Sequence, residues 1–243
     1  MSTQDFLIKN VSLPNGVVGD IAVKDGVITS IIKDSKLQAE TVIDGSGCVA
    51  LPGLVDLHTH LREPGREDAE TVLTGSRAGA KGGFTGVSAM ANTSPVADTA
   101  GVVEQVFRLG KVAGLCDVNP IGAVTKGLNG EQLAEIGAMA DSDAKVRIFS
   151  DDGKCVSDAL LMRRALEYVK TFNGLIAQHA QDPKLTVNSQ MNEGSVSARI
   201  GLTGWPAVAE EAIIARDILL ANMVGARLHI CHVTTAGGVE IIR

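Results

Sequence analysis

The stretch Leu51-Pro-Gly-Leu-Val-Asp-Leu-His-Thr-His-Leu-Arg-Glu-Pro-Gly65 decides the fold that the sequence predicts. It begins as an apolar run and ends in polar residues. Alternate residues of a strand point to one face, so Asp56, His58 and His60 share a face. Glu63-Pro-Gly65 then breaks the strand, which places both histidines at its carboxyl end, where parallel α/β folds carry their chemistry. Two imidazoles side by side on a rigid strand make half of a metal site.

From residue 50 onward, apolar segments of strand length alternate with segments of helical pattern. One of these helices is expected to begin at Ser157 as its N-cap. Six such strand-helix units, with one long loop at 181–204, predict a parallel sheet and favour an incomplete eight-unit barrel. The expected strands after the first are 84–90, 115–124, 145–152, 175–180 and 226–233.

Residues 5 to about 50 read as β-structure. They include a short strand at 6–11 and a hairpin that turns at Asp25-Gly26, a pair typical of a type I′ turn. These strands need a partner sheet, because an isolated hairpin is marginally stable in water.

The composition excludes several classes of protein. A formal net charge of −6 argues against a nucleic-acid surface and against binding to anionic membranes. No run reaches the roughly 18 apolar residues of a membrane span, and the first residues lack the basic start and apolar core of a signal peptide. We therefore expect a cytoplasmic protein whose four cysteines are free thiols.

Further candidate metal ligands also fall at the ends of expected strands. His179 ends the fifth strand, His232 ends the sixth, and an aspartate pair ends the fourth. Strand alternation puts Asp152 on the face with the smaller side chains, so Asp152 is the favoured inward carboxylate and Asp151 the fallback. His229 is expected to point outward or to pack against a helix.

Four imidazoles and one carboxylate are too many ligands for one catalytic zinc, which usually takes three protein ligands. They suit two metals about 3.5–4 Å apart that share a bridging carboxylate and a hydroxide. Such a pair favours hydrolysis, or its reverse, at an amide-like bond. The sequence has no Gly-rich phosphate loop and no nucleophile elbow that would compete with this interpretation.

The segment 52–65 resembles the signature of dihydroorotases in the cyclic amidohydrolase superfamily, and its His60-Leu-Arg-Glu-Pro-Gly65 string is specific. The resemblance favours the bacterial class with an aspartate as bridging ligand, because hydantoinases and allantoinases typically carry a carbamylated lysine at that place. Further segments continue the resemblance in the same order: Ala89-Met-Ala-Asn-Thr-Ser-Pro95, Phe149-Ser-Asp-Asp-Gly153, Gln178-His-Ala180 and His229-Ile-Cys-His232.

The resemblance implies a role for each candidate residue. Substrate contacts are implied for His60, Arg62 and Asn92, the last two on the substrate's carboxylate. The planar fork of Arg62 suits a carboxylate, whereas Asn92 also fits a simple loop-capping role, which stays open. The implied ligands of two zinc ions are His58 and His60 for the first, His179 and His232 for the second, and Asp152 as the bridge.

The resemblance also implies a fold and an activity. Residues 1–50 are expected to form an N-terminal β-sandwich segment. Residues 51–243 are expected to form about six of the eight units of an amidohydrolase TIM barrel. The implied activity is the reversible hydrolysis of (S)-dihydroorotate to N-carbamoyl-L-aspartate by a zinc-activated hydroxide, in de novo pyrimidine (UMP) biosynthesis.

One family residue has no counterpart in the sequence. Dihydroorotases carry a further aspartate that acts as general acid/base late in the barrel, which would lie beyond residue 243. We therefore assign no catalytic acid/base and expect residues 1–243 alone to be nearly inactive. The expected partner is a small-molecule substrate, and a homo-oligomer or an association with aspartate transcarbamoylase stays open. The alternatives are a hydantoinase- or allantoinase-like amidohydrolase and a non-catalytic scaffold subunit.

Overall fold

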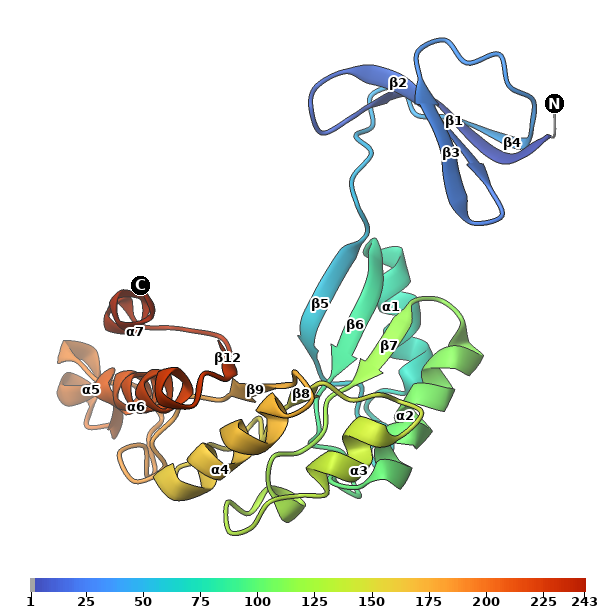
Figure 1. Cartoon of the computed structure of the whole chain (residues 1–243). Helices are drawn as coiled ribbons and strands as arrows, with labels where there is room; N and C mark the ends of the chain where they lie inside the picture. Colours follow the sequence, from blue (N-terminus) through green and yellow to red (C-terminus); the bar gives the residue numbers. More distant parts are fainter. Residues whose placement is uncertain (1–2) are drawn as a thin grey trace. The chain divides into compact units, whose positions relative to one another are not determined.

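The computed structural model describes residues 3–243 (Figure 1). The chain divides into two compact units, and the division falls between Gly53 and Leu54. Unit 1, up to Gly53, contains strands only, and unit 2, from Leu54 onward, contains alternating strands and helices. Each unit has its own strand pairing and its own buried residues.

Unit 1 is a single four-stranded sheet. Its strands are β1 (Gln4–Ser12), β2 (Val18–Lys24), β3 (Val27–Ile32) and β4 (Ala39–Asp44). They lie in the order β3-β2-β1-β4, with β4 parallel to β1 and the other pairs antiparallel. The predicted hairpin is confirmed, because Asp25 and Gly26 have φ angles of 51° and 73°, as a type I′ turn requires.

The sheet of unit 1 leaves many large apolar side chains exposed. On β3 and β4, for example, Ile28 is 57% exposed and Val42 is 59% exposed. β-Branched side chains on an uncovered sheet face are typical of a sheet that packs against another layer. The buried apolar residues among those described in unit 1 are Leu7, Val11, Ile21 and Ala22.

Unit 2 confirms the predicted alternation of strands and helices. Its main strands are β5 (Leu54–Thr59), β6 (Phe84–Ala89), β7 (Asp117–Pro120), β8 (Ile148–Phe149), β9 (Leu175–Gln178) and β12 (Arg227–Ile230). Its helices are α1 (Val72–Lys81), α2 (Ala100–Ala113), η1 (Lys126–Leu128), α3 (Ile136–Asp141), α4 (Ala159–Lys170), α6 (Val208–Val224) and α7 (Ala236–Ile242). The expected long loop after β9 contains β10 (Met191–Asn192), α5 (Ser195–Ile200) and β11 (Gly204–Trp205).

The strands of unit 2 are parallel and follow one another in chain order. One sheet has the order β5-β6-β7 and another the order β8-β9-β12. A single bridge between Gly122 and Phe149 joins the two, and Ser150 N–H donates to the carbonyl of Gly122 at 2.8 Å beside it. Because parallel strands share a direction, their carboxyl ends lie along one edge, and polar residues at those ends become neighbours.

Helices α2, α3 and α4 contribute to the main apolar core of unit 2. Val103, Met139 and Leu166, one from each helix, belong to the same buried cluster as Phe149 of β8 and Ile176 of β9. All five residues are fully buried, at 0% exposed. This core fixes β8 and β9 and therefore the residues that follow them.

Two local predictions were wrong in detail. Helix α4 is capped by Asp158, whose carboxylate accepts the N–H of Leu161 at 2.7 Å, so the predicted cap at Ser157 is one residue early. The strand expected at 145–152 is only Ile148–Phe149, because the chain leaves the sheet soon after the Gly122 bridge. Asp152 therefore lies in a turn and not on a strand face.

The remaining sequence predictions concern membranes and cysteines. Within residues 3–243, none of the helices is both long enough and apolar enough to cross a membrane. The four cysteines are free, as expected. Burial raises the pKa of the Cys231 thiol to about 12, and nearby Asp152 adds to this effect, so the thiol stays protonated near neutral pH.

Candidate metal centre

The carboxyl end of β5 brings two imidazoles together. His58 lies on the strand and His60 directly follows it, and their ring centroids are 5.2 Å apart. The N–H of His58 donates to the Asp56 carboxylate at 3.0 Å, which helps to hold the backbone at this point. The two-residue spacing therefore places both imidazole rings on the same side of the chain at the end of β5, as the sequence predicted.

Asp152 receives this first pair on one of its two oxygens. Oδ2 lies 3.2 Å from Nε2 of His58 and 3.4 Å from Nε2 of His60. The residue is only 4% exposed. Its N–H donates to the Ser150 hydroxyl at 3.1 Å, which helps to fix the turn that follows β8.

The second pair of imidazoles faces the other oxygen of the same carboxylate. His179 follows β9 and His232 follows β12. Nδ1 of His179 and Nε2 of His232 each lie 3.0 Å from Oδ1 of Asp152, and these nitrogens are 3.1 Å from each other. One carboxylate thus offers one oxygen to each histidine pair, which is the arrangement of a bridging ligand.

The donor set fits metal ions. Two groups have ligand atoms close enough to share an ion, one from His58, His60 and Asp152 and the other from Asp152, His179 and His232. Imidazole nitrogen and carboxylate oxygen are ligand atoms that zinc and related divalent ions accept. The structure therefore contains residues that could hold a metal on either side of Asp152.

The protonation preferences of the centre have identifiable causes. Burial opposes the charge of Asp152, but hydrogen bonds from His179 and His232 and the nearby imidazoles hold its pKa well below the ordinary value. Burial lowers the pKa of His58. Burial also disfavours a charged His179, but its contacts with Asp152 and Gln181 raise its pKa overall. A charged Asp152 and a neutral His58 are the forms that bind a cation.

The candidate substrate residues lie in the loops after β5 and β6. Arg62 follows β5 with a φ of 60° and is half-buried. Asn92 follows β6, and its Oδ1 accepts a hydrogen bond from Nδ1 of His60 at 2.9 Å. Because an amide oxygen only accepts, this contact leaves the lone pair of His60 on Nε2, the atom that faces Asp152. Neither the sequence pattern nor the resemblance indicated this contact.

The two remaining candidates lie outside the cluster. Asp151 is 2% exposed and accepts the N–H groups of Val124 and Thr125 at 2.8 and 2.9 Å, together with the Thr125 hydroxyl. Burial raises the pKa of Asp151. These contacts hold the segment after β7 against the turn that follows β8, so Asp151 has a structural role in this region. His229 is exposed, as expected.

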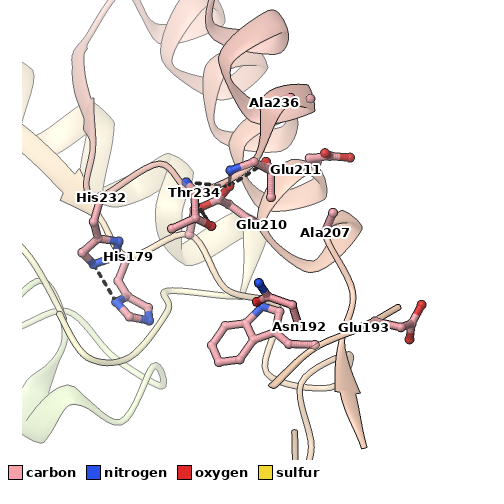
Figure 2. A pocket seen from close by; sticks show the side chains of 13 residues that line it. His179, Asn192, Glu193, Ala207, Glu210, Glu211, His232, Thr234 and Ala236 are labelled. Atoms are coloured by element: carbon pink, nitrogen blue, oxygen red, sulfur yellow. Dashed lines mark hydrogen bonds between the residues drawn. The ribbon is translucent and has the colours of Figure 1, made fainter. Parts of the chain in front are cut away.

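A pocket of about 730 Å³ opens beside the second imidazole pair. Figure 2 shows His179 and His232 together at one side of it and Glu193 on the far side. Glu210, which is 6% exposed, accepts the N–H and hydroxyl groups of Thr234 and Thr235 and so anchors the loop after β12. Asn192, Trp205 and Glu211 also line the pocket.

Sequence reasoning did not single out the residues that support the ligands. Oε1 of Gln181 lies 2.8 Å from Nε2 of His179. Glu210 holds the segment that follows His232. Gln181 follows a recognised ligand by two residues, but it lies in a loop without periodicity. Glu210 has the ordinary position of an acidic residue in the first turn of a helix.

Comparisons with known proteins identify relatives of the chain. Residues 47–237 match the family model described as dihydro-orotase-like. The chain is 65% identical to a dihydroorotase of Leifsonia xyli over 243 residues, which are 100% of this chain and 56% of that protein. It is 63% identical to a dihydroorotase of Streptomyces coelicolor, covering 98% of this chain and 55% of that protein. The chain therefore spans about half the length of these curated relatives.

Among solved structures, an L-hydantoinase (dihydropyrimidinase) from Arthrobacter aurescens has a similar fold. The TM-score is 0.79 at 23% sequence identity, and the match covers 99% of this chain and 55% of that one. At this level of identity the likeness concerns the fold, which is an α/β fold of the hydantoinase and amidohydrolase type.

Proposed function

Since this chain belongs to the dihydroorotase-like family, we propose that it forms the metal-binding part of a dihydroorotase. The reaction is the reversible hydrolysis of (S)-dihydroorotate to N-carbamoyl-L-aspartate in pyrimidine biosynthesis. The observation that carries the proposal is the Asp152 carboxylate, which faces one histidine pair with each of its oxygens at 3.0–3.4 Å. The relatives named above make the dihydroorotase reaction the first choice among the hydrolases that such a centre would serve.

We propose that unit 2 is an incomplete (β/α)8 barrel and that unit 1 is part of a β-sandwich. Parallel strands in chain order, each followed by helical structure, support the barrel. The meeting of His58 from the first strand with His232 from the last, at 5.3 Å between ring centroids, requires the strands to curve toward each other. The exposed apolar residues of β3 and β4 support a second layer over the sheet of unit 1.

The proposed ions are two zinc ions, with Asp152 as the bridge. His58 and His60 would hold one, and His179 and His232 the other. When bound, such ions supply Lewis-acid chemistry, because they polarise a carbonyl oxygen and lower the pKa of water. The chain's own part is to keep Asp152 charged and His58 neutral.

Substrate orientation is assigned to Arg62 and Asn92, with His60 beside them. The guanidinium of Arg62 suits bidentate recognition of the substrate carboxylate. Because Asn92 already contacts His60 through its oxygen, its amide nitrogen remains a donor for the same carboxylate. The 730 Å³ pocket has the size of a small-molecule site.

The activity is tested with a chimera in which residues 1–243 are followed by the rest of the Leifsonia xyli relative. We expect it to interconvert dihydroorotate and N-carbamoyl-L-aspartate in both directions after zinc loading. Faster turnover of neutral hydantoins than of dihydroorotate would contradict the choice of substrate. The expected inactivity of residues 1–243 alone stays a prediction, which the same assay on the short chain checks.

The substrate role of Arg62 is tested by Arg62→Ala in the chimera. Its kcat/KM for dihydroorotate should fall by on the order of 10–100-fold for each lost charge-assisted contact, while the zinc content stays unchanged. Arg66→Ala is the matched control, because Arg66 lies in the same loop with a 64% exposed side chain. Equal activity losses from both variants would argue against a specific contact with the carboxylate.

Metal content and assembly are tested on the 243-residue chain. Elemental analysis after zinc loading should find zinc in the wild-type chain, and a chain without any bound metal would favour the non-catalytic scaffold instead. Association with a second copy or with aspartate transcarbamoylase stays a prediction, which analytical ultracentrifugation with and without that partner checks.

A further inference from the structure

A series of side-chain hydrogen bonds leads away from the metal centre on the outer side of His179. Nε2 of His179 and Oε1 of Gln181 are 2.8 Å apart. Nε2 of Gln181 donates to the Thr186 hydroxyl at 2.8 Å, and this hydroxyl donates to the carbonyl of Asp182 at 2.9 Å. Thr186 is 9% exposed, and His179 and Gln181 are partly buried.

The direction of these hydrogen bonds is fixed by their last acceptor. A backbone carbonyl has no proton to give, so the Thr186 hydroxyl donates its only proton to Asp182. Its oxygen is then free to accept from the NH2 group of Gln181, which turns the amide oxygen toward His179. An amide oxygen only accepts, and Nε2 of His179 must therefore carry the proton.

This protonation determines which nitrogen of His179 is available as a ligand. In a neutral imidazole with the proton on Nε2, Nδ1 has the lone pair. Nδ1 is the atom that lies 3.0 Å from Asp152 and 3.1 Å from Nε2 of His232. At His60 the contact with Asn92 favours the other tautomer. There Nδ1 donates to the amide oxygen of Asn92, and Nε2 faces Asp152.

We propose that Gln181 and Thr186 are positioning residues that hold His179 in the Nε2–H tautomer and so present Nδ1 to the second metal. The proposal rests on the proposed metal centre. Outer partners of this kind fix the orientation of a ligating imidazole and raise its basicity, and their loss typically costs 10–100-fold in metal affinity.

The tautomer is measured by long-range ¹H–¹⁵N correlation spectra of the metal-free 243-residue chain with ¹⁵N-labelled histidine at alkaline pH. The chain carries Asp152→Ala, because without a metal the Asp152 carboxylate would itself accept a proton from Nδ1 of His179 and compete with Gln181. The signals of His179 are assigned by their absence in His179→Gln. We expect a protonated Nε2 in this Asp152→Ala background and a mixed or reversed tautomer when Gln181→Leu is added. Gln181→Glu keeps an acceptor oxygen and should restore the protonated Nε2, which a purely structural role would not predict.

Zinc titration of the same Gln181 substitutions in the chain with Asp152 intact, read by competition with a chromophoric chelator, provides the second readout. Gln181→Leu should weaken one of the zinc sites by about 10–100-fold. Thr186→Val keeps the shape of Thr186 but removes the acceptor of the Gln181 amide, so it should weaken the same site to a smaller extent. Gln105→Leu, the same change on the exposed face of α2, should leave both readouts unchanged.

An unchanged His179 tautomer together with unchanged zinc affinity in Gln181→Leu would overturn the proposal. If Gln181→Leu failed to fold, as judged by circular dichroism, Thr186→Val would decide by the same two criteria. A wild-type chain that bound no zinc would refute the metal centre. The tautomer measurement needs no metal and would still test the hydrogen bonds to His179, so the two failures are distinguishable.

Discussion

The two histidine pairs face one carboxylate, but β5, which carries the first pair, and β9, which carries His179 of the second, have opposite surroundings. β5 pairs with β6 alone, and its Val55 and Leu57 are 61% and 52% exposed. β9 pairs on both sides, and its Ile176 and Gln178 are 0% and 1% exposed. An edge strand and a core strand thus provide equivalent ligands, which shows that ligand geometry does not depend on burial of the whole strand.

The difference lies in what supports each pair. Beyond β5, the support comes from loop contacts, since the Glu63 carboxylate accepts the N–H of Val72 at 2.7 Å and Asn92 contacts His60. Beside His179, the support is a buried network, in which Gln178 donates to Asp217 at 2.8 Å. The first pair therefore depends on the shape of its loops, and His179 of the second pair depends on the packed core.

The largest expected effect is that of Asp152→Ala, which acts on both pairs. Because the two oxygens of Asp152 face different pairs, its removal should abolish zinc binding at both sites, as measured by elemental analysis. Asp151→Asn should keep the metal but lower stability, since Asp151 binds the Val124 and Thr125 backbone. If the Asp151 variant lost its metal and the Asp152 variant kept it, Asp151 and not Asp152 would be the bridging ligand.

A substitution in each strand tests the difference in burial. Ile176→Ala removes a fully buried side chain from the core and should lower the free energy of unfolding by about 2–5 kcal/mol. Leu57→Ala on the edge strand should cost roughly 1 kcal/mol or less, because that side chain is half exposed. Urea unfolding of both variants gives the comparison, and equal losses would remove the distinction between the strands.

The loop after β5 is tested at Gly65, which has a φ of 99°. A Cβ there would lie 2.1 Å from the carbonyl oxygen of Ser94, so Gly65→Ala should destabilise the loop by about 1–3 kcal/mol and weaken the site of His58 and His60. Gly153→Ala, next to Asp152, is the control because a Cβ there meets nothing within 4 Å. Zinc titration and thermal unfolding should separate the two variants.

The smallest expected difference is in local opening of the folded chain. Amide hydrogens of 176–178 should exchange more slowly than those of 55–59, because β9 is paired on both sides and buried while β5 is at an edge. Hydrogen-exchange mass spectrometry of peptides from both strands provides the measurement. Faster exchange in β9 would contradict the view that the core supports the second pair.

The sequence predicted the first pair well, because its information is local. The two-residue spacing of His58 and His60 needs only a strand, and β5 is one. The preference for Asp152 over Asp151 agrees with their positions in the structure, but the reason differs. Strand alternation was applied to residues that lie in a turn after β8, so the position of Asp152 comes from the turn and its hydrogen bond to Ser150.

Other features were beyond sequence reasoning because they depend on contacts between distant segments. The parallel pairing of β1 with β4 follows from the path of the chain after β3 and has no mark in local periodicity. Gln181 and Glu210 are ordinary polar residues whose roles come from what faces them, His179 in one case and the Thr234-Thr235 backbone in the other.

The bridge between Gly122 and Phe149 joins the two three-stranded sheets of unit 2 and has a consequence for the metal centre. His58 and His60 belong to the sheet before the bridge, and the other ligands follow strands beyond it. Ions held around Asp152 would therefore form a reversible cross-link across this seam. By thermodynamic reciprocity, separation of the sheets would weaken metal binding as much as metal release would weaken the seam.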